Sequence, residues 1–370
     1  MELTEAGALF LLFVVIALVQ KANLLALLAF FLGFSAFAVA NIPAATFGVQ
    51  PYHILGGAAI CKASHLLLTK YTQPRIGPHQ PFFWAYLFVA VVIFSMLLLA
   101  FQQKMPSRIL AQSVLLIFGV CVAASIFILV RDKESLVGIL KWYLFGGLFV
   151  AIWGMLQWAC SILGIEYPSW IFNNSVSSAA DLFDQVAIAG LPRISSVAIE
   201  PSYLGRYLGT LGAVMLVLSQ DGQARIISAG WTKIIVIGSV LVISTSSTAY
   251  LFIGLMAMYV FLTDVRQFTR YTAIGLSVAC VLLLLHPEFV DVFSKMTIDK
   301  AQSGSYEERT SSMLFGYRAF ADAPFFGNGW GWMPEGEGVH DTIFKICSSL
   351  GVVGFWLKAY PSGSGSAYMW

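Results

Sequence analysis

The stretch LVGILKWYLFGGLFVAIWGMLQWACSIL (residues 136–163) decides the class of fold, because it is almost wholly apolar and long enough to cross a lipid bilayer. A membrane-spanning helix needs about 20 consecutive apolar residues. Runs of this kind recur along the chain, and the candidate spans are approximately 6–20, 22–40, 53–70, 82–101, 109–130, 136–163, 203–219, 229–244, 248–264, 270–286 and 341–357. The sequence therefore predicts an all-α fold, a polytopic transmembrane helical bundle with about 11 spans.

The composition agrees with a membrane protein. Hydrophobic residues make up 58% of the chain and charged residues 11%, whereas a soluble domain carries about 25% charged residues. The first apolar run has no cationic segment before it, so we expect a retained helix and not a signal peptide. The net charge of +2 gives no reason to expect a nucleic-acid partner. The five cysteines are scattered without a CxxC motif, so we interpret them as core residues and expect no metal site.

The positive-inside rule gives an orientation for the predicted bundle. One set of short connections carries a succession of basic residues and is expected in the cytoplasm: Lys21, Lys70, Arg75, Arg131, Lys133, Arg225, Arg266, Arg270 and Lys358. The opposite side holds two long loops, about 164–202 and 287–340. Span 53–70 contains Lys62 and His65, and if it does not cross the membrane, everything before it has the opposite orientation. Residues 1–357 are expected to form a single integral membrane domain. The Gly/Ser-containing tail 358–370 is a natural tail, a truncation or an expression remnant.

The first long loop ends in RISSVAIEPSYLGRYLG (residues 193–209), where Arg193, Glu200 and Arg206 surround the start of a predicted span. Ionisable groups at the membrane are expensive, so each needs a partner or a function. Pro201 suits the first position of a helix, and the N-terminal end of that helix would attract anions such as phosphates.

Each of these residues also has a plainer interpretation. Arg206 would extend its charge to the membrane interface, Glu200 would be a favourable acidic residue at a helix start, and Arg193 would be a solvated loop residue. Three glycines give the helix a small-residue face that suits close packing or close approach of a ligand: Gly205, Gly209 and Gly212.

The second long loop contains a predicted amphipathic helix at 306–322, in which an apolar repeat of Leu314, Tyr317 and Phe320–Ala321 has helical spacing. Pro324 ends this helix. Arg309 and Arg318 are nine residues apart, so they point to opposite sides of this helix and at most one of them easily faces a given site. The Gly-rich turn GNGWGW follows, and His340 then lies just before the last span. His340 is interpreted either as an interfacial residue or as a functional one.

These features resemble the O-antigen polymerase and O-antigen ligase superfamily of membrane glycosyltransferases. The signature is an arginine, a P-x-x-G-x-G turn, and a histidine before a helix that contains GxxG. It is matched here by Arg309, Pro324, Gly327, Gly329, His340 and GVVG (351–354). The segment EPSYLG (200–205) is similar to one in the polymerase branch, and STSSTA (244–249) to a serine-rich turn between two spans of the family. The resemblance covers roughly residues 190–355.

The resemblance implies transfer of a glycan from undecaprenyl pyrophosphate to an acceptor hydroxyl at the outer face of the bacterial cytoplasmic membrane. The sequence has no DxD motif, so arginines are expected to hold the pyrophosphate without a metal or another cofactor. One guanidinium group can donate two parallel hydrogen bonds to phosphate oxygens, and it stays protonated. The candidates are Arg193, Arg206 and Arg309, with Arg318 as a reserve. His340 is the candidate general base, Glu200 competes for that role, and direct displacement would invert the anomeric centre.

The product of the reaction is left open by the sequence. A polymerase would extend repeat units of O-antigen or a related surface polysaccharide on the lipid carrier, and EPSYLG favours this branch. A ligase would transfer the finished glycan to lipid A core or to protein. A flippase of the lipid-linked sugar is the alternative of another class, but its charges would lie near the bilayer midplane and its halves would often repeat. A chain-length regulator is an expected protein partner on family grounds.

Overall fold

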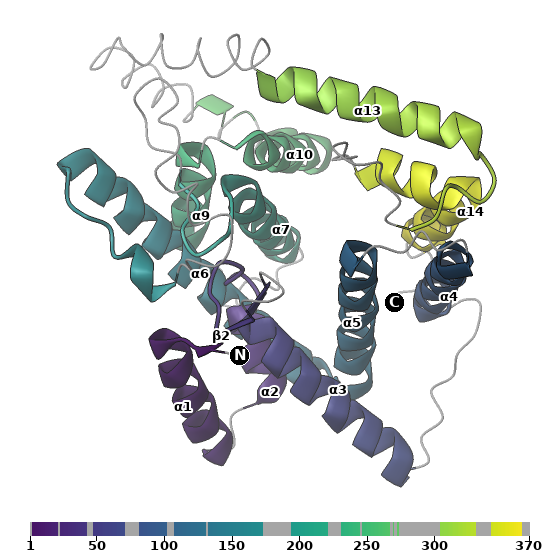
Figure 1. The fold of residues 1–370 in the computed structure, drawn as a ribbon. Helices are drawn as coiled ribbons and strands as arrows, with labels where there is room; N and C mark the ends of the chain where they lie inside the picture. Colours follow the sequence, from purple (N-terminus) through teal and green to yellow (C-terminus); the bar gives the residue numbers. More distant parts are fainter. Residues whose placement is uncertain are drawn as a thin grey trace. The chain divides into compact units, whose positions relative to one another are not determined.

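The structure is a computed structural model, which describes residues 2–20, 23–42, 47–70, 81–101, 107–130, 132–172, 194–220, 231–244, 246–266, 269, 272–273, 304–330 and 342–364. These residues are mostly helical (Figure 1). The chain divides into two compact units. Unit 1 comprises Met1–Ala59 and Val130–Thr297, and unit 2 comprises Ile60–Leu129 and Ile298–Trp370.

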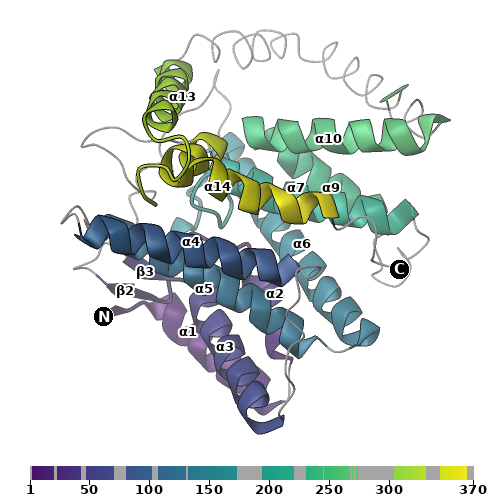
Figure 2. The same ribbon diagram turned by 90° about the vertical axis from the view of Figure 1, so that its right-hand side faces the viewer.

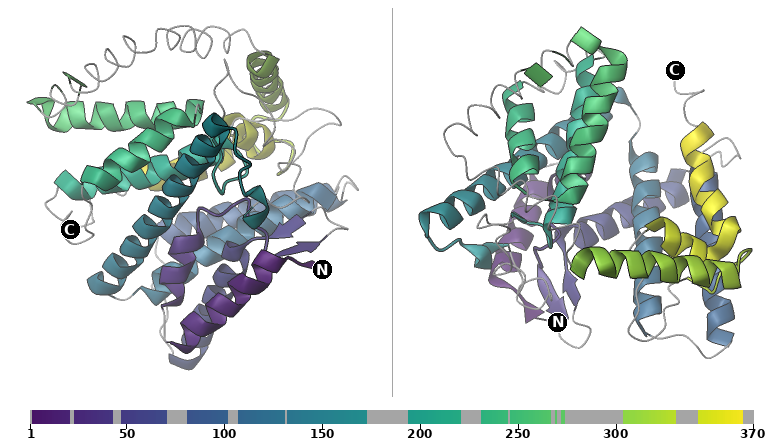
Figure 3. Two further views of the ribbon diagram at one scale, coloured as in Figure 1. Left: turned by 90° about the vertical axis from the view of Figure 1, so that its left-hand side faces the viewer. Right: turned by 90° about the horizontal axis from the view of Figure 1, so that it is seen from above.

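Unit 1 is organised around its longest helix. The elements are α1 (Glu5–Val19), α2 (Leu24–Phe31), α6 (Lys133–Leu163), the 3-10 helix η2 (Ser169–Ile171), α7 (Pro201–Gln220), α9 (Trp231–Ile243) and α10 (Ser247–Thr263). Helices α2, α7 and α9 all pack against α6, and α10 packs against α7 and α9 (Figure 3). Helix α6 is therefore the scaffold on which α2, α7 and α9 are placed.

Local signals in the sequence set both ends of α6. The carboxylate of Asp132 accepts a hydrogen bond from the backbone N–H of Ser135 at 2.6 Å, as an N-cap residue does. This bond holds the pKa of the Asp132 carboxyl below its usual value. Gly164 ends the helix in the left-handed conformation, with φ 65°, which a glycine adopts without strain.

A small antiparallel sheet, which the sequence did not predict, holds the N-terminal segment of unit 1. It consists of β1 (Glu2–Leu3), β2 (Ala40–Ile42) and β3 (Phe47–Val49) in the order β1-β2-β3. Leu3 lies opposite Ala40, and Asn41 lies opposite Gly48.

The prediction of one continuous span at 22–40 is wrong. Helix α2 ends at Phe31, and the chain then turns and enters β2. The run is apolar because it is buried in protein: the ring of Phe34 stacks on that of Phe149 at 5.5 Å, and a Cβ on Gly33 would stand 2.4 Å from the Tyr207 ring. Apolar content alone does not distinguish a lipid-facing run from one buried in the core.

Unit 2 consists of helices from two distant parts of the chain. They are α4 (Pro81–Phe101), α5 (Ser107–Leu129), α13 (Gly304–Asp322) and α14 (Thr342–Ser364). Helix α4 packs against α5 and α14, and α13 packs against α14 (Figure 2). A further helix, α3 (Pro51–Lys70), begins in unit 1 and ends in unit 2, because the division falls between Ala59 and Ile60.

Among the described residues, α6 alone is both long and apolar enough to be a candidate for crossing a membrane by length and composition. Shorter apolar stretches lie in six other helices: Glu5–Val19, Tyr86–Leu97, Ser113–Leu129, Lys233–Ile243, Ser247–Thr263 and Ile343–Phe355. Helices are present at most of the other expected spans, whereas most of 270–286 lies outside the described residues. The helical fold is confirmed, and the bundle of about 11 spans stays a prediction.

Candidate functional site

The segment before α7 is irregular in backbone and buried in unit 1. Ile194, Ser196 and Val197 are fully buried, although they belong to no helix or strand. Gln157, a buried residue of α6, meets the hydrogen-bonding needs of this segment. Its side-chain oxygen accepts from the backbone N–H groups of Ser195 at 3.1 Å and Ser196 at 2.7 Å. A buried N–H without a partner is destabilising, so Gln157 is what permits this chain path.

Ser196 fixes the segment further. Its hydroxyl donates to the backbone oxygen of Val150 in α6 at 2.6 Å, and its φ of 56° lies in the left-handed region. On the other side, the N–H of Ala36 donates to the carbonyl of Val197 at 2.9 Å. The N–H of Ile199 donates to the hydroxyl of Ser35 at 3.3 Å. The segment is thus held between α6 and the turn that follows α2.

Helix α7 begins at Pro201, as the sequence predicts. The carbonyl of Glu200 accepts from the N–H groups of Tyr203 and Leu204 at 3.0 and 3.2 Å, which makes Glu200 the cap residue. Its carboxylate is exposed and accepts from the Ser202 hydroxyl at 3.0 Å. The Arg206 side chain is also exposed, and its guanidinium carbon lies 5.2 Å from the centre of the Tyr203 ring, within cation–π range. Both predicted residues are therefore accessible within the first two turns of one anchored helix.

The glycine face of α7 serves close helix packing. A Cβ on Gly205 would stand 2.9 Å from the backbone nitrogen of Ala249, and one on Gly209 would stand 2.4 Å from Cγ of Phe252. Both contacted residues, Ala249 and Phe252, belong to α10. Ala249, the last residue of the serine-rich segment 244–249, consequently lies beside Gly205, which precedes Arg206 in the chain.

A second anchored feature lies in unit 2, where α14 is broken at Gly351. This residue has φ 63° and ψ −162°, far from helical values. The turn after α13 supplies the hydrogen bonds that the break removes. The N–H groups of Asn328 and Gly329 donate to the carbonyls of Ser348 and Ser349, each at 2.9 Å. Beyond the break, the N–H of Val352 donates to the carbonyl of Pro324 at 2.8 Å. Free backbone groups at helix ends need such partners.

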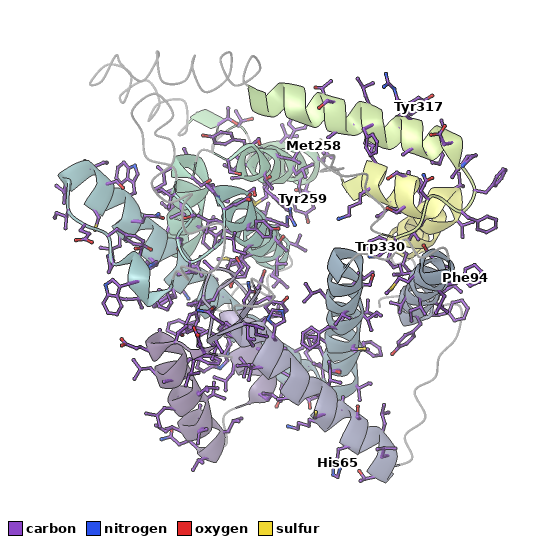
Figure 4. The ribbon with its side chains drawn as sticks, viewed as in Figure 1. His65, Phe94, Met258, Tyr259, Tyr317 and Trp330 are labelled. Atoms are coloured by element: carbon purple, nitrogen blue, oxygen red, sulfur yellow. The ribbon has the colours of Figure 1, made fainter. Side chains whose placement is uncertain are left out.

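The side chain of Asn328 reinforces the turn. Its amide donates to the carbonyl of Ala319 in α13 at 2.7 Å and to that of Ser348 in α14 at 3.1 Å. The next part of the turn is tied to α4, because the N–H of Trp330 donates to the Ser95 hydroxyl at 2.7 Å. Figure 4 labels Trp330 and, on α4, Phe94.

Only glycine fits at two positions of this arrangement. A Cβ on Gly327 would stand 2.2 Å from the carbonyl carbon of Ser349, and one on Gly351 would stand 2.3 Å from the carbonyl oxygen of Phe325. Both residues also have positive φ, which favours glycine. The Gly-rich turn and GVVG are recognisable in the sequence, but their contact with each other is not. The sequence offered one sign of this contact, namely two pairs of glycines, one in the turn before the last predicted span and one within that span.

The predicted site residues fall in different places. Glu200 and Arg206 lie together at the start of α7, in unit 1. Arg309 and Arg318 lie on α13, in unit 2, and the Arg318 side chain is exposed. Arg193 and His340 lie outside the described residues. Within the part of the chain that the structure describes, no group of three His, Cys, Asp or Glu side chains could hold a metal ion.

Four residues that the sequence did not single out hold the elements on which the predicted site residues lie. They are Ser35, Gln157, Ser196 and Asn328, which make the hydrogen bonds described above. Gln157, a glutamine inside an apolar run, was the one local sign of such a role, because a buried amide in a helix requires hydrogen-bond partners.

Part of the chain matches a known family of proteins. Residues 233–358 match the sequence model of a family described as O-antigen ligase. The matched region begins in α9 and includes α10, α13, the Gly-rich turn and the break in α14. No curated protein and no solved structure matches the chain significantly. The match supports the O-antigen ligase superfamily, whose members are integral membrane proteins of glycosyltransferase type.

Proposed function

We propose that the protein polymerises oligosaccharide repeat units carried on undecaprenyl pyrophosphate at the outer face of the bacterial cytoplasmic membrane. The observation that carries the proposal is the family match over 233–358. This region contains Arg309, the Gly-rich turn and His340 in the order of the family signature. The product is O-antigen or a related surface polysaccharide, and a chain-length regulator is a proposed partner.

Exposed apolar side chains support a multi-pass membrane location. Val19 in α1 is 77% exposed and Leu262 in α10 is 72% exposed, and several helices present large apolar residues in the same way. Exposure of so many large apolar side chains is unfavourable in water and is typical of membrane or protein contact. We propose that these faces contact lipid, with the loops 164–202 and 287–340 outside the cytoplasm.

The chemistry requires stabilisation of a departing pyrophosphate. The bond between the anomeric carbon of the donor sugar and the pyrophosphate oxygen breaks, and negative charge grows on that oxygen. Arg193, Arg206 and Arg309 are the proposed ligands, with Arg318 as a reserve. Each contact that strengthens as charge develops lowers the barrier by about 2–4 kcal/mol.

The acceptor hydroxyl attacks the anomeric carbon from the opposite face. Its proton passes to His340, and the new carbon–oxygen bond has inverted configuration. Neutral histidine is available near pH 7 for this step. Glu200 is the alternative base, and its exposed carboxylate already accepts a hydroxyl hydrogen bond from Ser202. The products are the lengthened glycan and undecaprenyl pyrophosphate.

The pairing of the Gly-rich turn with the break in α14 gives this chemistry a frame. The turn joins α13, which carries Arg309, to α14, which begins two residues after His340. Hydrogen bonds on both sides of Gly351 limit the movement of these two elements against each other. A catalytic arginine on α13 is therefore held in place relative to α14.

A ligase is the second candidate, because the matching family is described as O-antigen ligase. The two candidates differ only in the acceptor. Purified protein in liposomes is given lipid-linked repeat units alone, or with lipid A core. A polymerase produces a ladder of lipid-linked chains from repeat units alone, whereas a ligase produces only lipid A core conjugates. Absence of glycosyl transfer with both acceptors overturns the proposal.

A further inference from the structure

Helix α13 turns its small residues toward α14 and its large apolar residues outward. Ser312, Gly316 and Ala319 are buried on the face that packs against α14. The apolar repeat that made 306–322 look amphipathic points the other way: Leu314 and Tyr317 are both more than half exposed. Figure 4 labels Tyr317 on this helix.

Large apolar residues are exposed along α13 and in the turn after it, and we call this set the outer stripe: Met313, Leu314, Tyr317, Phe325 and Phe326. Positions 313, 314 and 317 lie within a quarter-turn to either side of one line along α13. The two phenylalanines follow in the turn after the helix and are 69% and 72% exposed. Large apolar groups gathered in this way rarely face water.

Helix α13 is too polar to cross a bilayer. Its 19 residues include five charged ones: Glu307, Glu308, Arg309, Arg318 and Asp322. Arg318 and Asp322 lie on one flank of the outer stripe, and both are exposed. An apolar stripe with charged residues along its edge is the pattern of a helix that lies in the plane of the membrane interface.

We propose that the outer stripe inserts into the headgroup region of the outer leaflet, so that α13 lies flat on the phospholipid bilayer. Arg318 then lies at the level of the lipid phosphates, to which its charge is complementary. Other large apolar residues of unit 2 are exposed as well, on α4 and α14: Phe94, Leu97, Ile343, Val352 and Phe355. This inference rests on the proposed function for the side of the membrane on which α13 lies.

The placement divides the two arginines of α13 between two roles. Arg309 and Arg318 are separated by nine residues, which is two and a half helical turns. With Arg318 on the lipid flank, Arg309 is left as the arginine of α13 that serves the pyrophosphate. The pyrophosphate of a lipid-linked donor lies at the headgroup level as well, so a helix at that depth holds its arginine at the height of the substrate.

The test measures depth with nitroxide labels in the full-length protein, in vesicles of phosphatidylethanolamine and phosphatidylglycerol. The five native cysteines are replaced, and single cysteines are introduced as Leu314→Cys, Tyr317→Cys and, as the matched control on the polar flank, Asp322→Cys. Labels at 314 and 317 are expected to collide more with oxygen than with a water-soluble nickel complex, and the label at 322 is expected to show the reverse.

Two outcomes overturn the inference. High nickel accessibility at all three positions means that the stripe faces water. Labels at 314 and 317 that are shielded from both reagents mean that protein covers the stripe. The result is independent of turnover: a lipid-exposed stripe in a protein without glycosyl transfer leaves the inference standing and overturns the proposed function alone.

Discussion

Gly327 and Ser349 approach so closely that a Cβ on the glycine would stand 2.2 Å from the carbonyl carbon of the serine. This contact joins the Gly-rich turn to the last helical turn of α14 before its break. It explains why the resemblance to the superfamily depends on glycines: they allow two backbones to meet and exchange hydrogen bonds.

Gly327→Ala is expected to lower the free energy of unfolding by about 1–3 kcal/mol, because the backbone it meets has little room to move. SDS titration of the protein in detergent micelles measures the change. Gly254→Ala is the matched control, since nothing lies within 4 Å of a Cβ there. This control is expected to be neutral or stabilising by up to about 1 kcal/mol. Equal stability of both variants contradicts the packing described for the turn.

Gln157→Leu is expected to destabilise unit 1, because the buried N–H groups of Ser195 and Ser196 lose their acceptor. The loss is about 1–3 kcal/mol for each group, measured by the same titration. Gln157→Glu keeps an acceptor oxygen and is expected to recover part of the stability. If the leucine variant is as stable as the parent protein, the segment before α7 is not held by α6.

Gly147→Ala and Leu211→Ala test how α7 is placed on α6. A Cβ on Gly147 would stand 2.0 Å from Cδ2 of Leu211, the far end of a flexible side chain. Each single variant is expected to be destabilised, but the double variant by less than the sum, with a coupling of about 0.5–3 kcal/mol. Additive losses would show that the two residues do not meet.

Arg309→Ala is expected to lower kcat/KM for glycosyl transfer about 10²–10³-fold, because it removes one contact to the departing pyrophosphate. Arg309→Lys keeps the charge but not the paired hydrogen bonds, so it is expected to recover little. Arg266→Ala removes an arginine from a connection expected in the cytoplasm, so it is the control and is expected to have a small effect. In cells, normal ladders of chain length from Arg309→Ala and Arg193→Ala would remove the pyrophosphate role.

His340→Ala is expected to lower kcat about 10²–10⁴-fold, as loss of a general base does. Donor affinity, measured by equilibrium binding of the lipid-linked substrate, is expected to stay close to that of the parent protein. A collapse of donor affinity with little change in kcat would make His340 a binding residue, and Glu200 would then be the remaining candidate base.

The sequence predicted the features that depend on neighbouring residues. Pro201 marked the start of α7, and Pro324 together with the apolar repeat marked the end of α13 near Asp322. These signals are local, because proline fixes its own φ and cannot continue a helix. The close-packing function of the glycines in α7 was one of two alternatives, and the contact between Gly209 and Phe252 decides between them.

Features that depend on distant residues were not predictable. The break at Gly351 requires the turn at Pro324 to supply its partners, and the burial of Ser196 requires Gln157, which is 39 residues away in the chain. The direction of the apolar repeat on α13 was equally undetermined, because Leu314 and Tyr317 have the same spacing whether they face protein or lipid. Periodicity identifies a face but not its neighbour.

Turnover without a divalent cation tests the central claim most directly, namely that arginine side chains hold the departing pyrophosphate. Purified protein in liposomes is assayed with undecaprenyl-pyrophosphate-linked repeat units in the presence of a chelator, and again with added magnesium or manganese. The account predicts the same rate of chain growth in both conditions, and loss of that rate in Arg309→Ala. A strict requirement for either metal, with Arg309→Ala still active once the metal is added, would contradict it.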